Sequence, residues 1–345
     1  MERDRQILRE IVEVHIATGE AVGSKTLAKR PGNRLSSASI RAVMHDLEER
    51  GLLAKRHTSG GRVPTDQGYR LYLDALFVPK RLRAPVVDQV AGLRWDEGRS
   101  AVDVIRQAAQ SLSQTMGCAS LIFTPRLESA ILQELEFVAL GRGRVLAIAV
   151  TRSGLVHERM LEVDDEPTRE TLTELTNYLN TLLPGRTLAE VRRLLETTQA
   201  QAQAVRSAVE TRALDLGRRA FEGHVDGGRA ELVVDGTAQI LASPEFTERP
   251  GIAADVVRAL AQRETWLDLI DRVLAAQDIE VYVGAETGRH ALASCGLVTG
   301  HYRAGGGRGV VMLLGPKRLD YRRAVPLVQM MRDRLTEVLE TEQAA

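Results

Sequence analysis

Apolar residues recur at helical spacing through the first fifty positions of the chain. Five aliphatic residues share one face of a predicted first helix: Ile7, Leu8, Ile11, Val12 and Ile16. Gly19 stands where a C-terminal cap is expected, and Ser24 can cap a short second helix that ends before Pro31. The pattern therefore predicts two helices before the first proline.

A third helix is predicted from Ser36 or Ser37, which can cap it, to Arg50, where Gly51 stops it. Its apolar stripe consists of Ile40, Val43, Met44 and Leu47. Its outward face consists of Ser39, Arg41, Ala42 and His45. Small polar and basic side chains outside and aliphatic ones inside are typical of a recognition helix that enters the DNA major groove.

A hairpin is predicted after the third helix, because LLAKRH and RVPT flank the turn sequence TSGG. Thr65 can cap a fourth helix beyond it. The order helix, helix, helix, hairpin is typical of a winged helix-turn-helix, in which the hairpin is the wing. In that arrangement His57, Ser59, Arg62 and the backbone N–H groups around Gly60 and Gly61 would lie against DNA phosphates.

The rest of the chain alternates between strand and helix patterns. The stretch VPKRLRAPV reads as a linker, and strand-like runs ASLIFTP, LQELEFVAL, RVLAIAVT and LVHERMLEV follow a helix over about 100–115. A long helical block comes next, and then IEVYVG, GLVTGHY and GVVMLLG resume the strand pattern before a last helix near Tyr321. We expect an α+β multidomain chain with one antiparallel sheet interrupted by a helical insertion.

The helical block is rich in leucine for an isolated helical hairpin. Its candidate dimerisation residues are Leu182, Leu183, Leu188, Val191, Leu194 and Leu195. So much apolar surface favours burial between two subunits, and a rigid spacer is the alternative. A two-fold dimer would match a palindromic DNA site.

Charge changes this picture only at the N-terminus. The chain has 345 residues with 46 basic and 46 acidic side chains, but residues 1–83 hold 16 basic against 10 acidic ones, and residues 21–65 hold nine against three. A basic module on an acidic body is typical of a protein that presents one face to a polyanion. This favours DNA over the alternative that the winged helix contacts protein.

The remaining residues argue against an enzyme. Cys118 and Cys295 are too few for a disulfide framework or a zinc site, and the seven histidines show no metal-ligand spacing. We see no nucleophile elbow, paired-carboxylate motif or P-loop, and AGGGRG at 304–309 reads as a hairpin turn. No cofactor or metal is expected. The charged N-terminus excludes a signal peptide or membrane span, so we expect a cytoplasmic protein.

Two long stretches of the chain resemble the HrcA family of heat-inducible transcription repressors. The N-terminal one includes TGEAVGSKTLAKR, LSSASIR, LEERGLL and HTSGGRVPTDQGYRLYLD, and the C-terminal one is CGLVTGHYRAGGGRGVVMLLGPKRLDYRRAVPLV. The resemblance implies a winged-helix DNA-binding domain over 1–78, a linker over 79–86, a GAF-like domain over 87–185 and 278–345, and a dimerising domain inserted over 186–277.

The resemblance also implies DNA contacts. Ser39, Arg41, Ala42 and His45 become candidates for base edges, and the candidates for phosphates are Lys25, Thr26, Ser37, Arg56, His57, Ser59, Gly60 and Arg62. The family pattern has an asparagine where this chain has Ala42, and an asparagine can pair bidentately with adenine at about 1–3 kcal/mol of discrimination. Either the operator differs here or His45 takes a share of the reading.

The implied function is repression of chaperone operons by a homodimer that binds an inverted repeat in double-stranded DNA, with the chaperonin GroEL helping to keep the repressor active. The alternative is a metabolite-sensing regulator with a small ligand in the GAF-like domain. An enzyme is the third and most distant reading.

Overall fold

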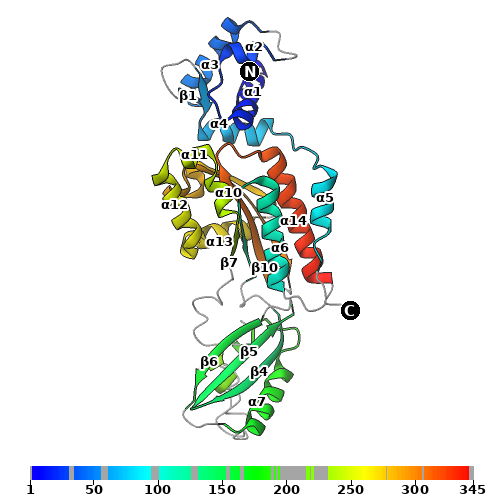
Figure 1. The fold of residues 1–345 in the computed structure, drawn as a ribbon. Coiled ribbons are helices and arrows are strands. Elements are labelled where there is room, and N and C mark those ends of the chain that lie inside the picture. The colour runs from blue at the N-terminus through cyan, green and yellow to red at the C-terminus, as the bar shows by residue number, and fades with distance from the viewer. Residues whose placement is uncertain are drawn as a thin grey trace.

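The computed structural model describes residues 2–30, 35–55, 61–94, 101–125, 131–152, 156–163, 167–187, 190–191, 193–194, 215–217, 219–220, 232–276, 278–304 and 307–341. Helices and strands are both abundant in them, which agrees with the predicted α+β class. Figure 1 shows an elongated molecule with the N-terminal helices at one end and a small separate sheet at the other.

The first part of the chain, residues 2–76, is called the N-terminal module. Its elements are α1 (Glu2–Thr18), α2 (Ser24–Ala28), α3 (Ser37–Glu49), β1 (Leu53–Lys55), β2 (Arg62–Pro64), α4 (Asp66–Leu71) and the π-helical turn η1 (Tyr72–Leu76). The four aliphatic residues predicted for the inner stripe of α3 are all buried. Ser36 caps α3 by accepting a hydrogen bond from the N–H of Ser39 at 3.1 Å, and Thr65 caps α4 through the N–H of Gly68 at 3.1 Å.

The body of the molecule is a five-stranded antiparallel sheet with the strand order β7-β3-β10-β9-β8. Its strands are β3 (Ala119–Phe123), β7 (Leu232–Asp235), β8 (Glu280–Val283), β9 (Cys295–Ala304) and β10 (Gly307–Pro316). β9 and β10 pair antiparallel with Gly307 opposite Ala304, which agrees with the hairpin that the sequence predicted there.

Helices cover both faces of this sheet (Figure 1). One face packs against α6 (Ala101–Met116) and α14 (Tyr321–Thr341), with α5 (Ala84–Ala91) beside them. The other packs against α10 (Thr237–Leu241), α11 (Pro244–Thr247), α12 (Pro250–Ala261) and α13 (Leu267–Ala275). Three short 3-10 turns complete the body: η4 (Arg263–Trp266), η5 (Gly284–Thr287) and η6 (His290–Leu292). Because the central strand β10 is buried on both faces, it carries a continuous apolar run from Val310 to Leu314.

A second sheet stands apart from the body. It contains β4 (Leu132–Gly141), β5 (Arg144–Thr151) and β6 (Val156–Glu162), with α7 (Arg169–Leu182) packed on one face. We call the described residues of 131–220 the small-sheet module. Its core also takes in Val191, Leu216 and Ala220, and is separate from the two cores of the body.

This division of the chain differs from the one predicted. The strand-like runs over 119–162 were expected to form one sheet, but β3 joins the body while β4, β5 and β6 pair only with one another. The expected insertion over 186–277 also divides, since β7 and the helices up to Ala275 pack on the body's sheet. The expected linker over 79–86 is partly helical, because α5 begins at Ala84.

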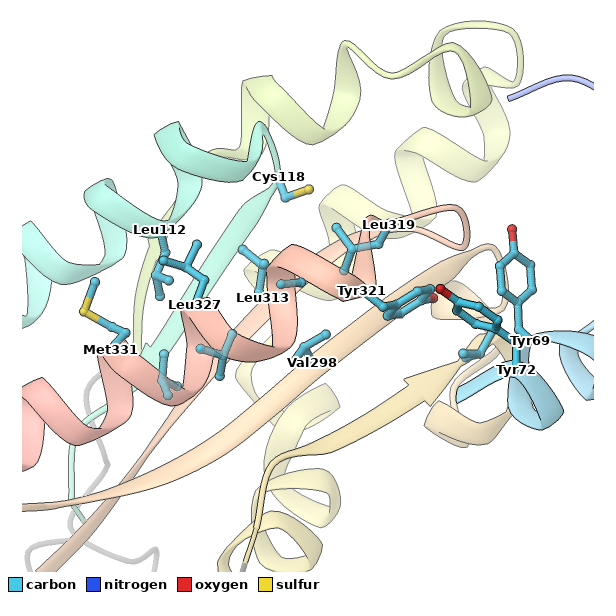
Figure 2. Packing of buried hydrophobic residues seen from close by; sticks show 14 of the residues in the cluster. Tyr69, Tyr72, Leu112, Cys118, Val298, Leu313, Leu319, Tyr321, Leu327 and Met331 are labelled. Atoms are coloured by element: carbon cyan, nitrogen blue, oxygen red, sulfur yellow. The ribbon is translucent and has the colours of Figure 1, made fainter. Parts of the chain in front are cut away.

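The N-terminal module is joined to the body through a continuous apolar core. Tyr69 and Tyr321 meet edge to face with ring centroids 6.2 Å apart. Figure 2 shows Tyr69 and Tyr72 gathered beside Tyr321 and Leu319 at the start of α14. The position of α3 is therefore tied to the body of the molecule.

Candidate nucleic-acid interface

The outward face of α3 carries the side chains that the sequence predicted. Ser39, Arg41, Ala42 and His45 are all exposed. In the described part of the chain, no carboxylate lies within ion-pair distance of Arg41, so its charge is available to a ligand. His45 Nε2 lies 3.7 Å from Oε1 of Glu49, and both side chains keep 67% of their surface exposed. Among the described residues, this face offers a cation without a carboxylate partner, hydroxyl and imidazole groups, and a small side chain that permits close approach.

The start of α2 lies beside α3 and adds two exposed groups, Lys25 and Thr26. Ser24 is buried, and its hydroxyl lies 2.9 Å from the hydroxyl of Ser37. Ser37, a predicted phosphate contact, is therefore half-buried and hydrogen-bonded within the module. Its observed contact fixes α2 against α3.

The hairpin departs from the expectation at Arg62. The guanidinium is paired with Glu48, with 2.8 Å from Nε and 2.7 Å from Nη2 to Oε2, and only 13% of the Arg62 side chain is exposed. Its charge is thus neutralised inside the module, and the structure does not present it as a free cation on the wing. The other predicted wing contacts, Arg56, His57, Ser59 and Gly60, lie outside the described residues.

Ion pairs distinguish the basic side chains of this region. Arg50 lies 3.6 Å from Asp4, and Lys55 lies 3.5 Å from Glu48. Lys25 on α2 and Lys29 directly after it are exposed without such a carboxylate among the described residues. Uncompensated positive charge therefore gathers on α2 and on the outer face of α3, where it would meet a polyanion.

Four of the six candidate dimerisation residues lie among the described residues, and two of these four are buried within one subunit. Leu183 and Val191 are each only 1% exposed, because they pack into the core of the small-sheet module within one subunit. Leu182 and Leu194 are half-buried, and Leu182 packs against the same core. Leu188 and Leu195 lie outside the described residues. A leucine-rich helical pattern cannot by itself separate an internal core from a subunit interface.

Sequence reasoning missed the apolar surface that this module does expose. Val156 and Met160 on β6 are 55% and 48% exposed, and Leu140 on β4 is 44% exposed. Met160 stands directly opposite Leu146 on β5, and Val156 opposite Val150, so apolar side chains form rows across the face turned away from α7. The sequence did contain a signal for this surface, because aliphatic residues occupy both faces of β5.

Neither cysteine is placed for chemistry. Cys118 and Cys295 are buried, and burial raises the pKa of each thiol to about 12. His301 has its pKa lowered, first by burial and then by the positive charges of nearby arginines. Among the described residues, no group of three or more histidine, cysteine or carboxylate side chains could hold a metal ion.

A cavity of about 330 Å³ lies between the N-terminal module and the body. Its wall includes His15, Tyr69, Lys317 and Arg318. The hydroxyl of Tyr69 is buried and has no hydrogen-bond partner in the described part of the chain. In the same part, no helix is long and apolar enough to cross a membrane.

The chain is similar to known proteins over nearly its full length. A curated heat-inducible transcription repressor HrcA from Geobacter sulfurreducens is 34% identical over 342 residues, which cover 99% of this chain and 98% of that protein. A repressor of the same name from Sorangium cellulosum is 37% identical over 340 residues, covering 97% of each chain. A crystal structure described as that of a hypothetical protein covers 99% of both chains with a TM-score of 0.63 at 21% identity, which shows a shared fold. The family model for the HrcA protein C-terminal domain matches residues 102–325, and with these full-length relatives it shows that the chain belongs to the HrcA family.

Proposed function

We propose that this chain represses heat-shock chaperone genes by binding, as a homodimer, an inverted-repeat operator in their control regions. The observation that carries the proposal is the outer face of α3, where Arg41 is exposed without a carboxylate partner among the described residues, beside Ser39 and His45. Members of the family are named transcription repressors, and none of the chemistry described above is that of an enzyme.

We assign the N-terminal module as a winged helix-turn-helix and the body as the GAF-like domain. Three helices followed by a two-stranded hairpin support the first assignment. The second rests on the family resemblance, which is compatible with an antiparallel sheet covered by helices. In this proposal α3 reads base edges through Ser39, Arg41 and His45, while Lys25 and Thr26 contact phosphates.

The dimer in this proposal forms through the small-sheet module, by the exposed rows around Met160 and Val156. Exposed apolar side chains on one face of a sheet favour an interaction surface, and here Glu136 and Glu158 lie among them, on either side of Ile148. Two-fold symmetry then supplies one α3 to each half-site of a palindrome. Substituting Met160→Lys should leave a monomer in light scattering, and a persistent dimer would move the interface elsewhere.

The deciding experiment is a fluorescence anisotropy titration with two duplexes, one carrying the inverted repeat from upstream of the host's own chaperonin operon and one with the repeat scrambled. We expect the repeat to bind at least about 1,000-fold more tightly, which is the lower end of the range for specific sites. Equal binding of both duplexes at every salt concentration would reject the operator proposal. Adding GroEL to the titration tests whether the chaperonin keeps the repressor active.

The variant Arg41→Ala tests whether α3 contacts the bases of the operator. It should weaken binding to the repeat more than binding to the scrambled duplex, because a base-edge contact contributes only to the specific complex. The control is Arg258→Ala, which removes another exposed arginine, from α12 in the body. Equal losses on both duplexes for Arg41→Ala would exclude a base contact.

The alternative of a metabolite-sensing regulator is favoured by one observation, the cavity of about 330 Å³ between the N-terminal module and the body. A ligand there would lie between the N-terminal module and the body, not inside the GAF-like domain as the sequence reading placed it. A ligand that binds only the folded state at 100 times its dissociation constant would raise the unfolding free energy by about 2.7 kcal/mol, which a thermal-shift screen detects.

A further inference from the structure

The last turn of α3 carries a carboxylate that faces the β1–β2 hairpin. Oε2 of Glu48 accepts a hydrogen bond from Nε of Arg62 at 2.8 Å, and Nη2 of Arg62 lies 2.7 Å from the same oxygen. Oε1 of Glu48 lies 3.5 Å from Nζ of Lys55. The Glu48 and Arg62 side chains keep only 22% and 13% of their surface exposed, so this pair is better shielded than an ordinary surface ion pair.

The pairing register explains why a carboxylate is needed at this point. Lys55 on β1 stands directly opposite Arg62 on β2. Like charges at opposing positions destabilise an antiparallel pair. Glu48 lies between the two cations, so it removes their repulsion and ties both strands to α3.

Arg62 also holds the segment that leads into α2. The N–H of Val22 donates to the carbonyl of Arg62 at 2.8 Å, and the N–H of Arg62 donates to the carbonyl of Val22 at 3.0 Å. The neighbouring Gly61 packs closely here, since a Cβ at that position would lie 2.8 Å from the Cβ of Ala21. Arg62 therefore joins α3, the hairpin and the approach to α2.

We propose that Glu48 is a positioning residue for DNA binding, which holds the hairpin in a fixed position relative to the outer face of α3 through Arg62 and Lys55. Arg62 belongs to this clamp and does not bind a phosphate. The inference rests on the proposed DNA-binding function and deepens it. In this proposal the exposed side chains of α3 contact the DNA, while Glu48, Arg62 and Lys55 fix the position of α3 relative to the hairpin.

The clamp requires an ionised carboxylate. Burial raises the pKa of Glu48, but the hydrogen bond and charge of Arg62, followed by those of Lys55, outweigh it and hold the pKa below its ordinary value. The pair is therefore charged at neutral pH and would weaken only as the pH falls through the lowered pKa of Glu48.

The clamp and simple electrostatics predict opposite effects of Glu48→Gln on DNA affinity. Removing a negative charge near DNA should strengthen binding if Glu48 is only a surface charge, because repulsion from the phosphates falls. We expect operator binding to weaken about tenfold instead, since hydrogen bonds to charged groups contribute at about that level. The matched control is Asp46→Asn, an exposed acidic residue two positions away on α3, which should leave binding unchanged or slightly stronger.

Arg62→Gln separates a clamp from a phosphate contact. As part of the clamp it should weaken binding by about the same factor as Glu48→Gln, and the double variant should lose no more than either single one. The slope of log K against log salt should stay at its wild-type value. A phosphate contact would flatten that slope by about one unit. A flattened slope in Arg62→Gln, or stronger binding by Glu48→Gln, would overturn the proposal.

Hydrogen exchange in the free protein distinguishes a failure of this inference from a failure of the proposed function. In Glu48→Gln the amides of Val22 and Arg62 should exchange about tenfold faster, because their mutual hydrogen bonds lose the anchor on α3. Amides in α6 should exchange at the wild-type rate, which shows that the variant is folded. If the wild-type protein binds no duplex, the DNA-binding proposal fails while the exchange result still decides whether Glu48 holds the hairpin. Unchanged exchange at both amides would overturn the clamp.

Discussion

The N-terminal module and the small-sheet module are attached to the same body in two different ways. Buried residues of the N-terminal module continue without a break into the core beneath α6 and α14, with Tyr69 packed against Tyr321. The small-sheet module buries its own residues between its strands and α7. A shared core makes two parts open together, whereas a separate core allows one part to open alone.

Polar contacts also hold the N-terminal module against the body; we call this contact region the joint. Arg70 of α4 donates to both carboxylate oxygens of Glu286 and to the carbonyl of Val281, the last at 2.6 Å. Arg322 at the start of α14 reaches Glu13 on α1 at 3.0 Å. These contacts fix the orientation of α3, so a change in the body is felt at the proposed DNA-binding face. In the proposed dimer, the small-sheet module would hold the second subunit without constraining that face.

The largest expected effect concerns thiol reactivity, because both cysteines of the chain lie in the body and none lies in the small-sheet module. Burial raises both pKa values from 9.0 to about 12, so at pH 8 the native thiolate population falls about a thousandfold. Two signals are followed as urea is raised: amide exchange in the small-sheet module and the reaction of the cysteines with dithionitrobenzoate. The small-sheet module should lose its amide protection at a lower urea concentration than the one at which the cysteines react. If both changes occur at the same urea concentration, the molecule unfolds as one cooperative unit, and the small-sheet module does not open separately from the body.

The same thiols give a pH dependence with a defined sign. Above pH 9 the unfolded chain releases thiol protons that the folded chain retains up to about pH 12. Stability is therefore fully present below pH 9 and falls as the pH rises through this window. Urea titrations of the wild type and of a Cys118→Ala variant at pH 8 and 10 check this, since the variant should lose less between the two.

Tyr321→Ala should destabilise the N-terminal module and the body together. The ring is fully buried against Tyr69, and its hydroxyl donates to the carbonyl of Lys317 at 2.8 Å. We expect a loss of about 4 kcal/mol, typical of a large aromatic core truncation. Hydrogen exchange should rise in peptides from both α1 and α14 while those of β5 keep their wild-type rates. Exchange that rises in α14 but not in α1 would show that the module is stable without the joint.

Leu175→Ala is the matching substitution in the small-sheet module, where Leu175 is fully buried between α7 and the sheet. A loss of about 3 kcal/mol is expected, and it should appear only in exchange of β4, β5, β6 and α7. Faster exchange in α3 or α4 would mean that the two modules are coupled through the body, contrary to their separate cores.

The sequence predicted the N-terminal module well because its signals are local. Aliphatic residues at helical spacing, caps, and glycines after the helices lie within one turn of the feature they determine. Ser36 and Thr65 cap their helices as predicted, but Ser24 does not, because α2 begins at Ser24 itself with Gly23 in the cap position. The outward face of α3 followed from the same periodicity, and all four of its predicted residues are exposed. Their roles in binding DNA stay a prediction.

Strand partners and side-chain pairs could not be predicted in the same way, because they depend on residues far apart in the chain. Alternation identified β4, β5 and β6 as strands, but nothing local says that β3 pairs with β10, nearly two hundred residues away. One usable signal was that ASLIF is apolar except for Ser120 and is buried on both faces, whereas β4 has exposed positions among its buried ones. Arg62 was read as a phosphate contact because its partner, Glu48, lies fourteen residues away on another element.

Asp66→Asn should have the smallest effect, and it tests the polar half of the joint. Oδ1 of Asp66 lies 2.5 Å from Nζ of Lys317, and Oδ2 accepts from the N–H of Ala285 at 3.2 Å. The carboxylate approaches so closely that a Cβ at Gly284, whose φ is +56°, would lie 2.2 Å from Oδ2. The asparagine keeps the size and an acceptor but loses the charge, so we expect about 1 kcal/mol at low salt and less at 1 M salt.

The control for Asp66→Asn is Asp103→Asn, whose ion pair with Arg106 at 3.1 Å lies on the surface of a single helix. That pair should contribute almost nothing to the free energy of unfolding, because both side chains are exposed and the contact joins residues already held by α6. A salt-dependent loss in Asp66→Asn alone would show that charge across the joint helps to set the orientation of the N-terminal module. Equal losses in the two variants would leave the apolar contact of Tyr69 with Tyr321 as the feature that sets it, and would make the shared core a sufficient account of how the two parts are joined.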